Sequence, residues 1–101
     1  SDAVSYFLKG LAEMDLKDST AAFASLHSAL SIKPNFPEAA YHLALYTLQT
    51  NQKEEGLKLL QQALKGAKQM PADKLMLYTN GTAQQFIESI NASIAYYQGR
   101  A

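Results

Sequence analysis

The sequence predicts an all-α domain built from stacked pairs of helices. The first observation is self-similarity at a shift of 34 positions, by which Leu26 corresponds to Leu60 and Pro37 to Pro71. Self-similarity at a fixed period of this length is typical of repeat proteins in which each helical unit packs on the next. The second observation is composition, because helix formers dominate and the 101 residues include only five glycines and three prolines.

The first pair of helices is predicted from apolar residues at three- and four-residue spacing. Asp18 and Ser19 offer a cap for the second helix. That helix stops at Lys33, because the residue before a proline avoids helical backbone angles. The first helix, from near residue 3 to about residue 17, carries Tyr6, Phe7, Leu11, Ala12 and Met14, and the second carries Ala22, Phe23, Leu26, Ala29 and Leu30.

The second pair begins at Pro37, since the first helical turn is where proline is best tolerated. Asn51 is predicted to cap the fourth helix, with Glu54 as the reciprocal partner of a capping box. The fourth helix is expected to end near residues 66–70. The third helix carries Tyr41, Leu43, Ala44, Leu45 and Leu48, and the fourth carries Leu57, Leu59, Leu60, Ala63 and Leu64.

The last segment, residues 71–101, gives two conflicting signals. An apolar stripe at helical spacing favours a single long helix, straight or kinked. Against this, Asn80-Gly81 is a breaker pair, and Thr82 with Gln85 would cap a new helix start. We favour the single helix. The stripe consists of Leu75, Thr79, Thr82, Phe86, Ile90, Ile94 and Tyr97.

Charge and cysteine content narrow the function classes. The formal net charge is zero, so the chain has no basic stripe for nucleic acid or for an anionic membrane surface. It has no cysteine, which excludes disulfides and thiol chemistry. No apolar run is long enough to span a bilayer. A cytoplasmic location fits these features, and so does a periplasmic or other compartment.

These residues resemble the tetratricopeptide repeat (TPR) family, whose pattern places small residues where two helices cross closely. The matching residues are Tyr6, Gly10, Ala22, Leu26, Ala29 and Pro34 in the first repeat, and Leu43, Ala44, Gly56, Leu60 and Ala63 in the second. The resemblance implies a right-handed superhelix of two repeats, residues 3–36 and 37–70, in a single domain spanning residues 1–101. Residues 71–101 would form a long C-terminal capping helix. The departures from the family pattern are Lys9, Glu13, Ala40 and Lys68.

In the TPR family, the first helix of each pair lines a concave groove that holds extended peptides or partner helices. The resemblance therefore implies a protein-interaction scaffold that binds a hydrophobic or amphipathic segment of another protein. Because the groove positions are mainly apolar, we do not expect a clamp for a partner's terminal carboxylate. The implied groove residues are Phe7, Leu11, Met14, Asp15, Glu38, Tyr41, Leu45, Leu48 and Gln49.

Other interpretations stay open. The groove residues can be ordinary core, covered by the C-terminal segment or by a second copy of the chain. The chain can also be a self-association module that pairs two copies through the same surface or through part of the last stripe. A remote interpretation is an accessory helical domain of a larger enzyme or regulator. The candidate residues for self-association are Phe86, Ile90, Ile94 and Tyr97.

Motifs for catalysis, metals or cofactors are absent from the sequence. His27 and His42 are the only histidines, and they do not have a metal-ligand spacing. The chain has no glycine-rich phosphate loop and no nucleophile elbow. We therefore expect no enzymatic activity, no metal and no cofactor.

Overall fold

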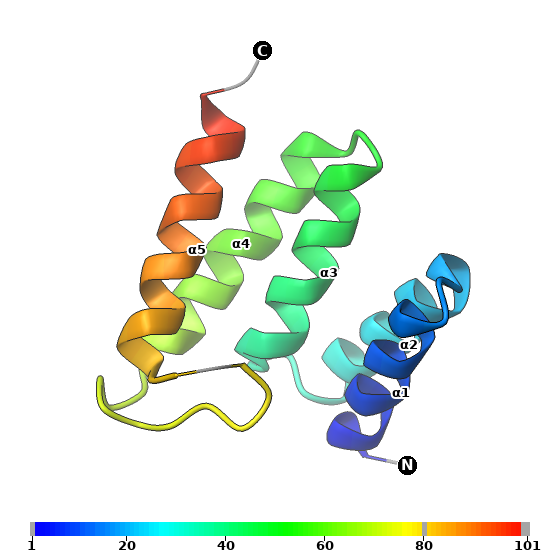
Figure 1. Cartoon of the computed structure of the whole chain (residues 1–101), viewed down its shortest axis with the longest axis horizontal. Coiled ribbons are helices and arrows are strands. Elements are labelled where there is room, and N and C mark those ends of the chain that lie inside the picture. Colours follow the sequence, from blue (N-terminus) through cyan, green and yellow to red (C-terminus); the bar gives the residue numbers. More distant parts are fainter. Residues whose placement is uncertain (1, 80, 100–101) are drawn as a thin grey trace.

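Two helical hairpins and a fifth helix make up the part of the chain that the computed structural model describes, residues 2–79 and 81–99 (Figure 1). The first hairpin packs against the second through α2 and α3, and α5 packs on α4. The helices are α1 (Ala3–Asp15), α2 (Ser19–Ile32), α3 (Pro37–Gln49), α4 (Lys53–Lys68) and α5 (Ala83–Gln98).

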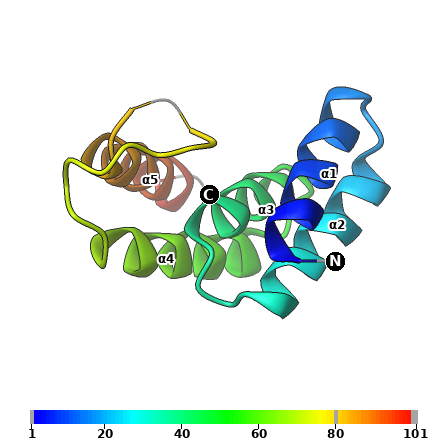
Figure 2. The ribbon, with the colours of Figure 1, turned by 90° about the horizontal axis from the view of Figure 1, so that it is seen from below.

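Among the helices, α3 packs mainly against α4 and α2, and its remaining side is covered less completely. Figure 2 shows α4 on one side of α3, with α1 and α5 rising on either flank of the opposite side. We call this opposite side of α3, with the flanking surface of α1, the inner face. It includes Leu11 and Met14 of α1 and Tyr41 and Leu45 of α3, which are half-buried or exposed at its surface.

Helix starts follow the predicted chemistry in two places and depart from it in a third. The Asp18 carboxylate accepts a hydrogen bond from the Ala21 N–H at 3.2 Å, which confirms the predicted cap of α2. Pro37 lies in the first turn of α3, as predicted. The predicted cap by Asn51 is wrong. Gln52 holds the N-cap position of α4 without a side-chain hydrogen bond, because Asn51 adopts a left-handed backbone conformation instead.

The turns inside the two hairpins have the same backbone geometry. Lys17 has φ of 61° and Asn51 has φ of 62°. After each of them, an N–H reaches back to the end of the preceding helix: Asp18 donates to Glu13 O at 2.9 Å, and Gln52 donates to Thr47 O at 3.2 Å. Such bonds satisfy carbonyls that a helix end leaves without partners. The repeat is therefore visible in the backbone as well as in the side chains.

The predicted single helix over residues 71–101 is wrong, because α5 begins only at Ala83. Gly81 has φ of 100°, which interrupts a helix. The alternative start is confirmed: Thr82 N–H donates to Gln85 Oε1 at 2.8 Å, and Gln85 N–H donates to Thr82 Oγ1 at 3.2 Å. Leu75 and Thr79 thus lie in an irregular connection rather than on a helical stripe.

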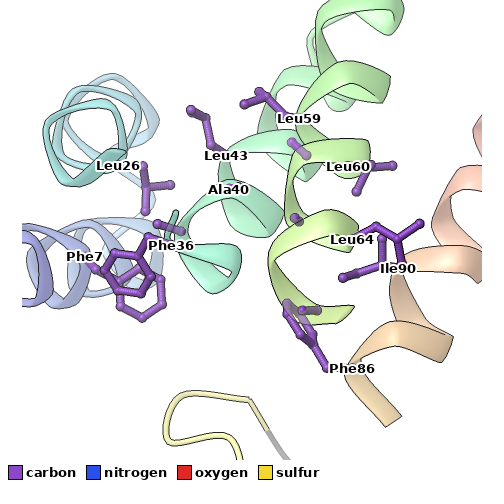
Figure 3. Close-up of a cluster of buried hydrophobic side chains, with 14 of the residues drawn as sticks. Phe7, Leu26, Phe36, Ala40, Leu43, Leu59, Leu60, Leu64, Phe86 and Ile90 are labelled. Carbon is purple, nitrogen blue, oxygen red and sulfur yellow. The ribbon is translucent and has the colours of Figure 1, made fainter. Parts of the chain in front are cut away.

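The core runs through all five helices and contains the residues that carry the repeat (Figure 3). Leu26 and Leu60, which correspond across the repeat, are both fully buried. Glycine allows the closest helix approaches, since a Cβ on Gly10 would lie 3.1 Å from the Leu26 side chain. Burying one leucine side chain contributes about 1.5–3 kcal/mol. The periodic leucines therefore stabilise each hairpin and its contact with the next.

Candidate functional site

Three of the nine predicted groove residues are buried. Phe7 is fully buried, and its ring packs against Phe36 with 5.0 Å between ring centroids. Leu48 is buried against Gly56, which has no Cβ at the closest contact between α3 and α4. Glu38 is also buried, at the start of α3. Each of these three residues is at most 8% exposed.

The other six predicted groove residues keep accessible surface. Met14 is 37% exposed, and Leu11, Tyr41 and Leu45 are half-buried. Asp15 and Gln49 are exposed at the C-terminal ends of α1 and α3. The division follows from what covers each position: Phe36 and Tyr78 pack against Phe7, and Leu48 packs against Gly56.

A hollow of about 370 Å³ joins the end of α1 to the second half of α3. It brings together Met14, Leu45 and Gln49 from the predicted set. Sequence reasoning missed its other lining residues, which are Lys17, Ser19 and Tyr46. Tyr46 follows Leu45 directly and packs against Phe23 with ring centroids 5.2 Å apart. The sequence signal for adding Tyr46 to the predicted groove was its position, as an aromatic residue directly after a groove leucine.

A second hollow, of about 410 Å³, lies at the opposite end of α3. Glu38 lines it, together with Lys33, Lys74 and residues 75–78. Burial raises the pKa of the Glu38 carboxyl above its usual range, because the charged form loses water contacts. Backbone N–H groups, the Tyr78 N–H among them, and the two lysines oppose this rise in pKa only in part.

His42 lies on α3, and its ring packs against two aromatic rings. Its ring packs 5.8 Å from the centroid of Phe7 and 5.8 Å from that of Tyr41. Burial lowers the pKa of His42, so the neutral imidazole is favoured. Its Nε2 atom is buried without a hydrogen-bond partner, and so is Thr79 Oγ1.

Three of the four residues proposed for self-association are covered within one chain. Phe86, Ile90 and Ile94 are buried, and Figure 3 shows Phe86 and Ile90 on α5 directed toward α4. Phe86 also packs edge-on against Tyr41, with ring centroids 5.4 Å apart. Tyr97 is half-buried beside Tyr96. This stripe therefore attaches α5 to the second hairpin.

Within residues 2–79 and 81–99, no group of three or more histidine, cysteine, aspartate or glutamate side chains is placed to hold a metal ion. Over the same residues, no helix has both the length and the apolar character needed to cross a membrane.

Comparison with known proteins supports the fold. The structure superimposes on a tetratricopeptide repeat domain protein from Salinibacter ruber, solved by solution NMR, with a TM-score of 0.78. The match covers 100% of this chain and 91% of the other at 13% sequence identity. No family model and no curated protein sequence matches the chain. The chain therefore has a TPR-like all-α fold, as the sequence predicts, and at this identity the likeness extends to the fold alone.

Proposed function

We propose that this chain is a protein-interaction module, without enzymatic activity or cofactor, that binds an apolar or amphipathic segment of a partner on its inner face. The observation that carries the proposal is the accessible apolar surface between α1 and α3. Met14 and Leu45 lie on the two sides of one hollow. Stacked hairpins give a rigid surface, and rigidity lowers the ordering cost of binding.

The proposed surface is narrower than the predicted groove. Buried Phe7, Glu38 and Leu48 support it from below, and the accessible residues make the contacts. Leu11, Met14, Tyr41 and Leu45 supply apolar area. Polar groups at the rim fix the register of the bound segment: Asp15, Lys17 and Gln49.

The test begins with a random 12-residue peptide library displayed on phage and selected against the immobilised chain. Peptides enriched in the selection are then measured by fluorescence anisotropy against Met14→Glu and Leu45→Glu. Each variant replaces an apolar side chain of the hollow with a charged one, which removes apolar contact area from the bound segment, so we expect at least a tenfold loss of affinity, about 1.4 kcal/mol.

Ile32→Glu is the matched control, because Ile32 is 50% exposed at the end of α2 and does not line the hollow. This variant is expected to bind the selected peptides as the wild type does. Circular dichroism checks that all three variants keep their helix content. If Leu45→Glu and Met14→Glu bind as tightly as Ile32→Glu, the inner face is not the binding surface.

Self-association is the second candidate function, and exposed leucines outside the core favour it. Leu8, Leu16, Leu75 and Leu77 are all exposed. Molar mass by light scattering, from micromolar to hundreds of micromolar chain, separates the two functions. A monomer over this range contradicts self-association, and a dimer makes an interface between copies the leading function.

A further inference from the structure

The second hollow, at the start of α3, has walls from two separate parts of the chain. One wall is the turn between α2 and α3, residues 33–36. The other is the connection between α4 and α5, which Figure 1 shows reaching beside the start of α3. Its volume of about 410 Å³ lies within the range of about 300–1,000 Å³ that is typical of ligand sites.

Exposed apolar side chains gather at this hollow. Leu75 is 72% exposed, Leu77 is 83% exposed and Val4 is 36% exposed, and all three line it. Phe36 and Met76 also line it and are buried. An accessible apolar patch with polar groups at its edge is typical of an interaction site. The hollow therefore offers apolar contact area to another molecule.

The charged groups of the hollow favour an anionic ligand. Its charged lining residues are Lys33 and Lys74, which are exposed, and Glu38, which is buried. Neither ammonium group forms an ion pair with a carboxylate in the part of the chain that the structure describes. Burial raises the pKa of the Glu38 carboxyl, so the negative charge is disfavoured there, whereas the exposed lysines keep their water contacts. The hollow thus presents more positive than negative charge.

Hydrogen bonds hold both walls of the hollow in place. In the turn between α2 and α3, Asn35 Nδ2 donates to Gln69 Oε1 at 3.0 Å. In the connection between α4 and α5, Ala83 N–H donates to Lys74 O at 2.8 Å. A surface that is ordered before binding loses less conformational entropy when a ligand binds.

We propose that the second hollow is an interaction surface for an apolar segment of a partner protein that carries an acidic side chain. The apolar side chains of the segment contact Val4, Leu75 and Leu77, and its carboxylate is held by Lys33 and Lys74. This surface is separate from the hollow of Met14 and Leu45, so the proposal does not depend on the function of the inner face. The concave shape favours a protein segment over the flat surface of an anionic membrane.

The test uses a random 12-residue peptide library, displayed on phage and selected against the wild-type chain. Displayed peptides are joined to the coat protein at their C-termini, so the carboxylates that they offer come from side chains. Enriched peptides are synthesised with amidated C-termini and measured by fluorescence anisotropy. Those that keep their affinity for Leu45→Glu bind outside the inner face and are carried forward. We expect this group to combine aspartate or glutamate with apolar residues.

Leu77→Ser tests the apolar part of the surface. Leu16→Ser is its matched control, because Leu16 is 79% exposed and lines neither hollow. We expect at least a tenfold loss of affinity for the selected peptides in Leu77→Ser, since covering a leucine side chain contributes strongly to binding. Leu16→Ser should bind as the wild type does.

Lys33→Gln/Lys74→Gln tests the charged part. The matched control is Lys58→Gln/Lys68→Gln, which removes the same net charge from exposed positions of α4 outside the hollow. Because exposed ion pairs are weak, we expect about a fivefold loss of affinity in the first variant and none in the control. The loss should shrink at high salt, where such pairs are screened.

Three results overturn the proposal. One is that no enriched peptide keeps its affinity for Leu45→Glu. Another is that either variant of the hollow binds the selected peptides as tightly as its matched control. The third is sedimentation with vesicles of phosphatidylglycerol and phosphatidylcholine that is lost in Leu77→Ser and kept in Leu16→Ser, which would assign the patch to a membrane surface. Loss of binding in Leu45→Glu alone concerns the inner face, so the two proposals fail separately.

Discussion

Replacing Gly56 by alanine tests the close approach of α3 and α4. A Cβ at this position would overlap Leu48 Cγ, and it would lie 2.7 Å from Leu48 Cδ2 and 3.3 Å from the Leu48 backbone nitrogen. The side-chain atoms can shift, but the backbone nitrogen belongs to a packed helix. Gly56→Ala therefore forces α3 and α4 apart or drives Leu48 out of its rotamer.

Two opposing effects set the magnitude. Alanine is favoured over glycine within a helix by up to about 1 kcal/mol. Overpacking a core contact costs about 1–3 kcal/mol. We expect a net loss of about 1 kcal/mol in the free energy of unfolding. For a domain of this size, that loss lowers the melting temperature by about 4–8 °C.

The assay is thermal and urea unfolding followed by circular dichroism, with Gly10→Ala as the control. A Cβ on Gly10 would meet only side-chain atoms, the nearest being Leu26 carbons at 3.1 Å. Because the ends of a leucine side chain can move, and alanine favours the helix, this variant should stay within about 0.5 kcal/mol of the wild type.

A double-mutant cycle isolates the contact between Gly56 and Leu48. Leu48→Ala alone should cost about 2–5 kcal/mol through the cavity it leaves. In the double variant, the alanine methyl at position 56 no longer meets a leucine side chain. We expect the two substitutions to be non-additive by at least about 0.5 kcal/mol, in the stabilising direction. Additive effects, or a Gly56→Ala variant as stable as the wild type, would refute the close-packing argument.

Three further predictions concern single side chains. Burial raises the pKa of the Glu38 carboxyl, so ionised Glu38 destabilises the folded state, and this effect grows as pH rises above about 4.5. Glu38→Gln should therefore raise the melting temperature at pH 7, and the gain should shrink toward pH 4. Burial lowers the pKa of His42, so folding stability should fall as pH drops below about 6.5. His42→Leu should reduce that loss, as measured by thermal unfolding between pH 5 and pH 8. Thr82→Ala removes the N-cap of α5 and should cost about 1 kcal/mol in urea unfolding, an effect that Thr82→Ser should largely avoid.

The helical hairpins were predictable because their signals are local and repeated. Apolar spacing, the Asp18 cap and Pro37 each act within about one helical turn. Because the pattern recurs after 34 positions, a helix assigned in one hairpin can be compared with the corresponding residues of the other. Asn51 was misread because asparagine serves equally well as an N-cap and as a left-handed residue. Its correspondence with Lys17, which cannot cap, was the evidence that favoured the second role.

The end of the chain and the candidate site were harder to predict, for a different reason. Residues at helical spacing can lie in the core or on an accessible face, and spacing alone does not separate Phe7 from Met14. Their burial depends on what another segment covers. The Tyr78 ring covers Phe7 from a position 71 residues later in the sequence, in a connection that the sequence pattern assigned to a helix.

The matching left-handed residues at Lys17 and Asn51 have a consequence for building longer versions of this chain. Lysine has no local preference for a positive φ, so the helices on either side impose this turn. A hairpin can therefore be duplicated as a cassette, inserted between residues 36 and 37, without redesigning the turn within it. The contact between hairpins is the part that would need design, because the structure contains one such junction, α2 on α3, and a duplicated hairpin adds a junction of a different pair of helices.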